Sequence, residues 1–111
     1  MALSPPASAS IAQINTPALV IDLDAVAGNI AATVKLLGGD ANRWRPHLKT
    51  AKLLLVMQRI REAGILQAKC ATTLELDTAC LAGFTDVLLA YPVVGPAVEV
   101  VTGIAGRHRQ V

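Results

Sequence analysis

Aromatic residues are nearly absent from this chain: its 111 residues include one Phe, one Tyr and one Trp, although 53% are hydrophobic. A core of this composition must therefore be aliphatic, built from Leu, Val, Ile and Ala. Cysteines are also few, and Cys70 and Cys80 have neither metal-site spacing nor the pattern of a disulfide framework. Both resemble small buried hydrophobes, so we expect a reduced, cytoplasmic protein.

Long runs of one charge and long apolar runs are missing as well. The net charge is only +2, and Lys and Arg form no continuous basic stretch, so no nucleic-acid partner is expected. The charge-free stretch 87–98 is too short to cross a bilayer and contains Pro and Gly, so we expect no membrane partner. Residues 1–10 are rich in Ala, Ser and Pro and lack a basic start, which predicts no secretory signal. We expect 1–15 to be a flexible segment.

What the chain does have is an alternation of short apolar runs and helical patterns. In two places an Ala-Gly pair closes a helix just before an apolar run, as in a repeated βα unit. The expected strands are 18–23, 43–48, 67–71 and 86–90, and the expected helices are 25–37, 51–63, 73–82 and 96–106. This order predicts an α/β fold with a parallel sheet and outer helices.

Two architectures satisfy that order, a doubly wound sheet and a (β/α)8 barrel. A complete barrel needs about 250 residues, and four βα units use nearly all of this chain. On the barrel interpretation, residues 16–111 form the N-terminal half of a TIM-type barrel. We expect Asp24, either Thr72 or Thr73, and Pro96 to begin helices, with Glu75 as a capping-box partner and Gly83 ending the third helix.

The most distinctive segment is Arg45–Lys52, because it places Lys49 at the end of an expected strand. Alternation along that strand puts Arg43, Arg45 and His47 on the same face as Lys49. An amine that is crowded by cations and partly shielded from water is a better nucleophile at neutral pH, and it suits Schiff-base chemistry. The local positive charge also fits a small anionic ligand.

Four blocks of sequence, in order, carry a resemblance to a known family. They are TPALVIDLD at 16–24 followed by Asn29, RPHLKTAK at 45–52, CAT at 70–72 and LLAYPVVG at 88–95. Together they resemble the D-threonine aldolase and D-serine dehydratase family. Its members are pyridoxal-phosphate (PLP) enzymes with an alanine-racemase-like N-terminal barrel, known as fold type III.

The resemblance implies that Lys49 forms the Schiff base with pyridoxal 5'-phosphate. The implied activity of the complete protein is that of a lyase of D-amino acid metabolism, the retro-aldol cleavage of a β-hydroxy-D-amino acid to glycine and an aldehyde. D-serine dehydration is the alternative, since Ala51 stands where many relatives carry a histidine and residues 73–77 match only loosely. Family members are metal-dependent, but their divalent-metal ligands lie near the C-terminus and none can be assigned here.

Other residues near Lys49 have two interpretations each. His47 is either a core histidine or a contact to the cofactor ring or substrate. Arg45 is first a structural ion-pair partner and second a cofactor contact. Tyr91 and Thr72 could touch the cofactor, although packing and helix capping are their simpler roles. Lys52, at the expected helix start, is a rival nucleophile or a phosphate-attracting surface charge.

A further hypothesis is that the 111-residue chain is a non-catalytic fragment that folds only with a partner segment or as a homo-oligomer. Half of a parallel barrel would leave two open strand edges, which invite association. On this hypothesis the isolated chain binds pyridoxal phosphate weakly or not at all.

Overall fold

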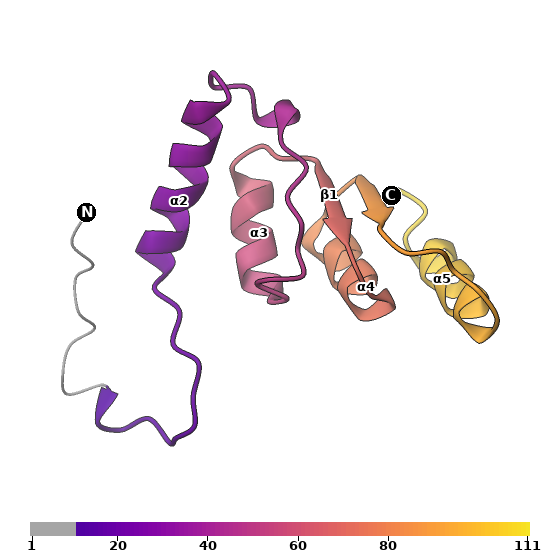
Figure 1. The fold of residues 1–111 in the computed structure, drawn as a ribbon, viewed down its shortest axis with the longest axis horizontal. Helices are drawn as coiled ribbons and strands as arrows, with labels where there is room; N and C mark the ends of the chain where they lie inside the picture. Colours follow the sequence, from indigo (N-terminus) through magenta and orange to yellow (C-terminus); the bar gives the residue numbers. More distant parts are fainter. Residues whose placement is uncertain (1–10) are drawn as a thin grey trace.

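The structure is a computed structural model that describes residues 11–111, so most of the expected flexible segment 1–15 lies outside it. Its elements in chain order are α2 (Leu23–Leu36), η1 (Ala41–Arg43), α3 (Leu54–Glu62), β1 (Gln67–Cys70), α4 (Thr73–Ala82), β2 (Asp86–Leu89) and α5 (Pro96–Arg107). The helices stand in a row in which α2 contacts α3, α3 contacts α4 and α4 contacts α5 (Figure 1). In residues 11–111 no helix has the length and apolarity to cross a bilayer.

The sheet is parallel, as predicted, and β1 and β2 form its regular part. Their register places Gln67 opposite Asp86 and Lys69 opposite Leu88. The extended stretch 44–47 joins the other edge of β1 through one bridge, between His47 and Lys69. The fold is therefore mixed α/β with parallel strands, which agrees with the expected class; the complete barrel remains a prediction.

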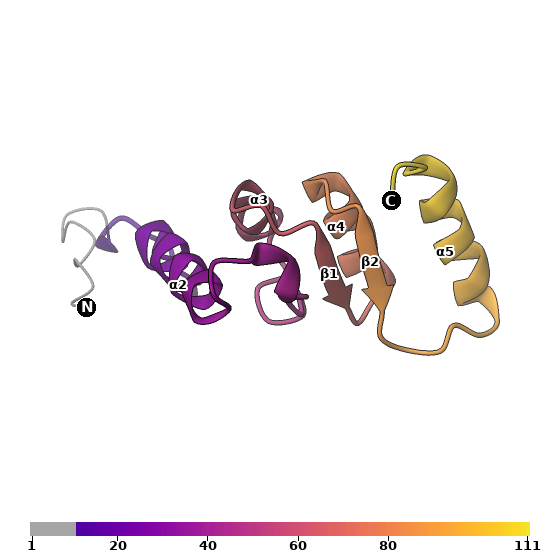
Figure 2. The same cartoon turned by 90° about the horizontal axis from the view of Figure 1, so that it is seen from above.

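One face of these strands is covered by helices and holds the core (Figure 2). The alternate β1 residues Ala68 and Cys70, and Leu48 at the start of the turn after the bridge, are at most 1% exposed. The helices contribute aliphatic side chains to two contiguous clusters, and Phe84 is the one aromatic residue buried among them. The helical members are Ile30, Val56, Met57, Ile60, Leu76, Ala79, Cys80 and Ile104.

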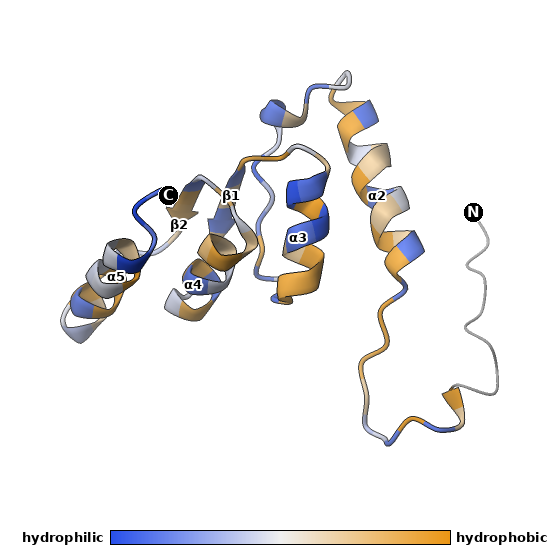
Figure 3. Ribbon diagram, turned by 180° about the vertical axis from the view of Figure 1, so that it is seen from behind, coloured by the Kyte–Doolittle hydropathy of each residue, from blue (hydrophilic) through white to orange (hydrophobic). Residues whose placement is uncertain are grey.

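The expected first strand, 18–23, is not found. Residues 18–22 lie outside any helix or strand, and Leu19 and Val20 are 81% and 56% exposed. Figure 3 colours this stretch as hydrophobic although it runs apart from the helix row. Its β-branched pattern favours an extended backbone, but a strand also needs a neighbouring edge to satisfy its N–H and C=O groups, and no ladder forms here.

The expected second strand and second helix are both shorter than predicted. Arg43 belongs to η1, and a turn begins at Leu48, so the expected strand 43–48 is reduced to the bridge at His47. The helix starts at Leu54 rather than at residue 51. Lys52 has φ +56°, a left-handed conformation that an α-helix does not accommodate, so the prediction that Lys52 begins a helix is wrong.

The other helix boundaries follow the expected signals closely. The Thr72 hydroxyl caps α4, Gly83 ends it with φ +91°, and Pro96 opens α5. The first helix is capped by Asp22, not by Asp24, because one oxygen of Asp22 accepts hydrogen bonds from the N–H groups of Asp24 and Ala25.

Candidate functional site

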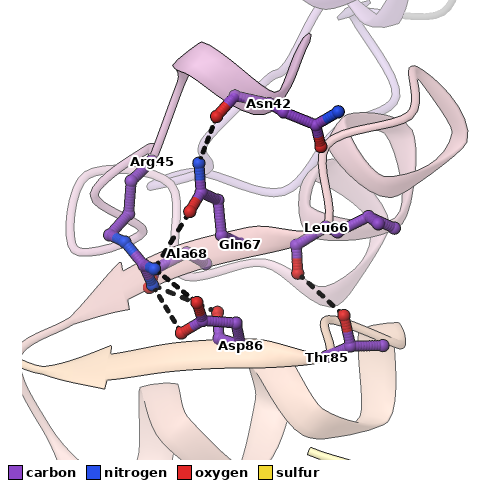
Figure 4. Close-up of polar contacts among 7 residues, drawn as sticks. All are labelled: Asn42, Arg45, Leu66, Gln67, Ala68, Thr85 and Asp86. Carbon is purple, nitrogen blue, oxygen red and sulfur yellow. Dashed lines mark hydrogen bonds and ion pairs between the residues drawn. The ribbon is translucent and has the colours of Figure 1, made fainter.

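The face of the strands opposite the core carries polar and charged side chains, and we call it the open face. Its first row across the sheet is Arg45, Gln67 and Asp86 (Figure 4). The Arg45 guanidinium donates to both carboxylate oxygens of Asp86, at 2.8 and 2.5 Å, and to Gln67 Oε1 at 3.0 Å. It also donates to the carbonyl of Ala68 at 3.0 Å. The row is a fixed hydrogen-bonded network.

This network determines what Arg45 can do. The hydrogen bonds from Arg45 lower the pKa of Asp86, burial opposes that effect slightly, and the positive charge adds to it. The same hydrogen bond to Asp86 raises the pKa of Arg45. The guanidinium is thus engaged by protein groups, which agrees with the structural ion pair expected as its first role.

The second row lies one pleat closer to the carboxyl ends of the strands. It consists of His47, Lys69 and Leu88, which are aligned by the bridge and by the β1–β2 register. His47 and Lys69 are half-buried, and Leu88 is 50% exposed. A histidine and a lysine therefore stand side by side on the open face, one row nearer the carboxyl edge than the Arg45–Asp86 ion pair.

Lys49 follows directly, in the turn 48–51 at the carboxyl edge of the sheet. Its backbone N–H donates to Nδ1 of His47 at 3.3 Å. The N–H of Leu48 donates to the Lys69 carbonyl at 2.8 Å, and the N–H of Lys52 donates to the Leu48 carbonyl at 3.0 Å. The backbone around Lys49 is therefore held on both sides, while its side chain is exposed rather than partly shielded as we expected.

Glu75 closes the site from α4 and is the buried charged residue of the described chain, with 3% exposure. Its Oε1 lies 2.7 Å from Nζ of Lys52, and its Oε2 accepts from the N–H of Ala71 at 2.7 Å. Burial by itself raises the pKa of Glu75. The hydrogen bonds from Lys52 and Ala71 and the positive charges of Lys52 and His47 outweigh burial, and the pKa is lowered.

The remaining predicted contacts lie at the same edge of the sheet. Thr72 follows β1, is exposed, and accepts a hydrogen bond from the N–H of Glu75 at 3.1 Å, so its expected capping role is confirmed. Tyr91 follows β2 and is 64% exposed. Lys49, Thr72 and Tyr91 thus each follow the carboxyl end of an extended segment, and His47 lies one row below.

Three residues of this region were not singled out by sequence reasoning as site residues. Lys69 and Asp86 occupy open-face positions, and strand alternation gave the available signal for both. Glu75 was expected to bond the N–H of the helix cap, as in a capping box. It bonds the N–H of Ala71 instead, one residue earlier, and its second oxygen is free to pair with Lys52.

Cys70 ends β1 at this edge but is buried on the covered face. Burial, with smaller contributions from Glu75 and Cys80, raises the pKa of the Cys70 thiol to about 11, so Cys70 is not a thiolate at neutral pH. A hollow of about 390 Å³ between α4, β2 and α5 is lined by Leu89, Val101 and Ile104, among others, and Lys49 does not contribute to it. Residues 11–111 contain no group of three or more His, Cys, Asp or Glu side chains that could hold a metal ion.

The geometry defines a class of site: an exposed amine at the carboxyl edge of a parallel α/β sheet, beside a histidine. Comparison with known proteins adds one relative. Over 77 residues the chain is 39% identical to D-threo-3-hydroxyaspartate dehydratase of Delftia sp. (strain HT23), a match that covers 69% of this chain. The chain spans only 20% of that protein's length. No protein-family model and no solved structure matches the chain.

Proposed function

We propose that this chain forms the N-terminal part of a pyridoxal-phosphate-dependent lyase that acts on β-hydroxy amino acids, with Lys49 as the amine that condenses with the cofactor. The observation that carries the proposal is the position of Lys49, exposed at the carboxyl edge of parallel strands, where α/β enzymes keep their reacting groups. The 39% identity to a hydroxyaspartate dehydratase supports it independently.

The residues present fit an anionic aldehyde. Lys49 offers an exposed primary amine at the carboxyl edge, and His47 and Lys69 place hydrogen-bonding groups on the open face one row below it. When bound, pyridoxal phosphate supplies an electron sink for bond cleavage next to the amino group. The protein's part is to hold the amine in place through the turn 48–51 and to orient ligands with His47, whose Nδ1 accepts from the Lys49 N–H.

Dehydration is the reaction that we propose first, because the relative's name states that activity. Retro-aldol cleavage to glycine and an aldehyde, which the motif resemblance implied, is the second candidate. Both need a β-hydroxy amino acid and the same lysine. The D-configuration of the substrate and a divalent metal remain parts of the proposal that rest on the family resemblance.

The (β/α)8 barrel is the architecture that we propose for the complete protein. Its interior layers are made of inward-pointing strand residues from alternate strands. The two rows of the open face, Arg45–Gln67–Asp86 and His47–Lys69–Leu88, would then form part of such an interior. Half of a barrel leaves strand edges without a neighbouring strand, and such edges favour association. We therefore also propose that the isolated chain tends to form homo-oligomers.

Reductive trapping tests the role of Lys49. The purified chain is mixed with pyridoxal phosphate, reduced with borohydride and mapped by peptide mass spectrometry, which captures weakly bound cofactor. We expect the phosphopyridoxyl label to concentrate at Lys49 and the long-wavelength absorbance of the unreduced mixture to disappear in Lys49→Ala. Lys35→Ala is the matched control, since Lys35 is an exposed lysine on α2. Equal labelling of Lys35 and Lys49 would favour the non-catalytic fragment.

A further inference from the structure

Two lysines stand three residues apart at the proposed site, Lys49 in the turn 48–51 and Lys52 directly after it. Lys49 and Lys52 are both exposed, and Lys52 keeps 59% of its side-chain surface accessible. Exposure therefore does not distinguish them. What distinguishes them is Glu75, whose carboxylate lies 2.7 Å from Nζ of Lys52, whereas no ion pair engages Lys49 among residues 11–111.

We propose that Glu75 is a positioning residue that withholds Lys52 from aldehydes and thereby directs condensation to Lys49. The inference rests on the proposed function for its biological meaning. Its physical basis is separate, because it concerns the relative reactivity of two amines toward any aldehyde.

An amine attacks an aldehyde carbon through the nitrogen lone pair, forms a C=N bond and releases one water molecule, so the ammonium form must first lose a proton. Deprotonation of Lys52 would leave the carboxylate of Glu75, which is 3% exposed, without its charged partner. An unpaired buried charge is costly, so the ion pair holds Nζ of Lys52 against the Glu75 carboxylate and keeps it from an incoming aldehyde.

The backbone adds a second constraint. Lys52 holds φ +56°, which is unfavourable for a residue with a side chain, and its N–H closes the turn onto the Leu48 carbonyl at 3.0 Å. The ion pair to Glu75 stabilises this conformation from the side-chain end. Glu75 in turn is fixed by the N–H of Ala71, so one carboxylate ties the turn 48–51 to the β1–α4 connection.

The test compares the four lysines of the full 111-residue chain, using formaldehyde with cyanoborohydride as one probe and pyridoxal phosphate with borohydride as the other. Lys35 is the internal reference for an exposed amine. In the wild-type chain we expect Lys52 to be modified about tenfold more slowly than Lys35, the scale of one hydrogen bond between charged groups. In Glu75→Gln that ratio should rise toward one, with Lys52 now carrying label beside Lys49.

Glu62→Gln is the matched control, because it removes an exposed glutamate that pairs with Arg59 and not with Lys52. It should leave the labelling pattern unchanged. If Glu75→Gln does not fold, as judged by circular dichroism, the wild-type chain is labelled with and without urea, and the protection of Lys52 should vanish in urea.

The outcomes separate this inference from the proposed function. If Lys52 reacts as fast as Lys35 in the folded wild type, or if Glu75→Gln folds and leaves Lys52 slow, the inference is wrong. If pyridoxal phosphate fails to label Lys49 preferentially, the result favours the non-catalytic fragment over the proposed function, and the formaldehyde ratios still decide whether Glu75 protects Lys52.

Discussion

The two faces of the same short strands have opposite characters. On the covered face Leu48, Ala68 and Cys70 are at most 1% exposed and pack against α3 and α4. On the open face Arg45, Gln67 and Asp86 form a polar row, with His47 and Lys69 above it. Neighbouring residues such as Leu48 and Lys49 therefore have unrelated roles, one in stability and the other in proposed chemistry.

Residues that stabilise the fold and residues of the proposed site are direct neighbours in the sequence. Leu48 anchors the start of the turn by burial, and the exposed Lys49 depends on that anchor for its position. Substitutions on the covered face should therefore lower the free energy of unfolding more than substitutions on the open face, which remove polar contacts but little packing. The three predictions below test that division.

The largest effect is expected from Leu48→Ala, compared with Leu88→Ala on the open face. Leu48 is 1% exposed and Leu88 is 50% exposed, although both are strand-region leucines. Deleting the buried side chain should lower the free energy of unfolding by about 2 to 5 kcal/mol, and deleting the exposed one by about 0.5 kcal/mol or less. Urea unfolding followed by the fluorescence of Trp44 measures both. Equal losses would mean that the two faces do not differ in packing.

An intermediate effect is expected from Arg45→Lys. A lysine keeps the charge but cannot make the forked contact to both oxygens of Asp86 while also reaching Gln67. The free energy of unfolding should fall by about 1 to 2 kcal/mol, the scale of a lost hydrogen bond to a charged group. Arg43→Lys is the control, since Arg43 is exposed and donates to one carbonyl. No difference between the two variants would show that the open-face row contributes no stability.

The smallest effect is expected on acidification. The pKa values of Asp86, Asp77 and Glu75 are lowered in the folded state, so their contributions are present above about pH 4, the unfolded pKa range. These contributions are lost as the pH falls through the lowered folded values. Asp86→Asn should flatten this decline by less than about 1 kcal/mol, because the pair is partly exposed. Unfolding free energies measured from pH 6 to pH 2 test the sign, and a steeper decline in Asp86→Asn would contradict it.

Local signals predicted the regions where a few neighbouring residues decide the structure. The αL glycine Gly83, the cap at Thr72 and Pro96 at the start of α5 act within one helical turn, and all three were found as expected. Strands β1 and β2 were also found within one residue of their predicted ends. In these segments the apolar pattern and the turn residues favour the same structure.

The predictions failed where a segment depends on a distant partner. The apolar run 18–23 favours an extended backbone, but pairing requires an edge supplied by another part of the chain, and no ladder forms there. Similarly, the helix expected from residue 51 starts only at Leu54. Lys52 has a left-handed backbone conformation, and its side chain pairs with Glu75 on α4. Nothing in the local sequence around Lys52 indicates that contact.

Periodicity and turn chemistry act over a few residues. The amino-acid sequence alone therefore predicts the parallel α/β order, the aliphatic core and the position of Lys49 just after an extended stretch. The ion pair between Arg45 and Asp86, and the pairing of Lys52 rather than Lys49 with a buried carboxylate, are seen in the folded structure and not in the sequence. Those facts depend on strand register and helix packing, which bring together side chains more than twenty residues apart, and no local pattern encodes such contacts.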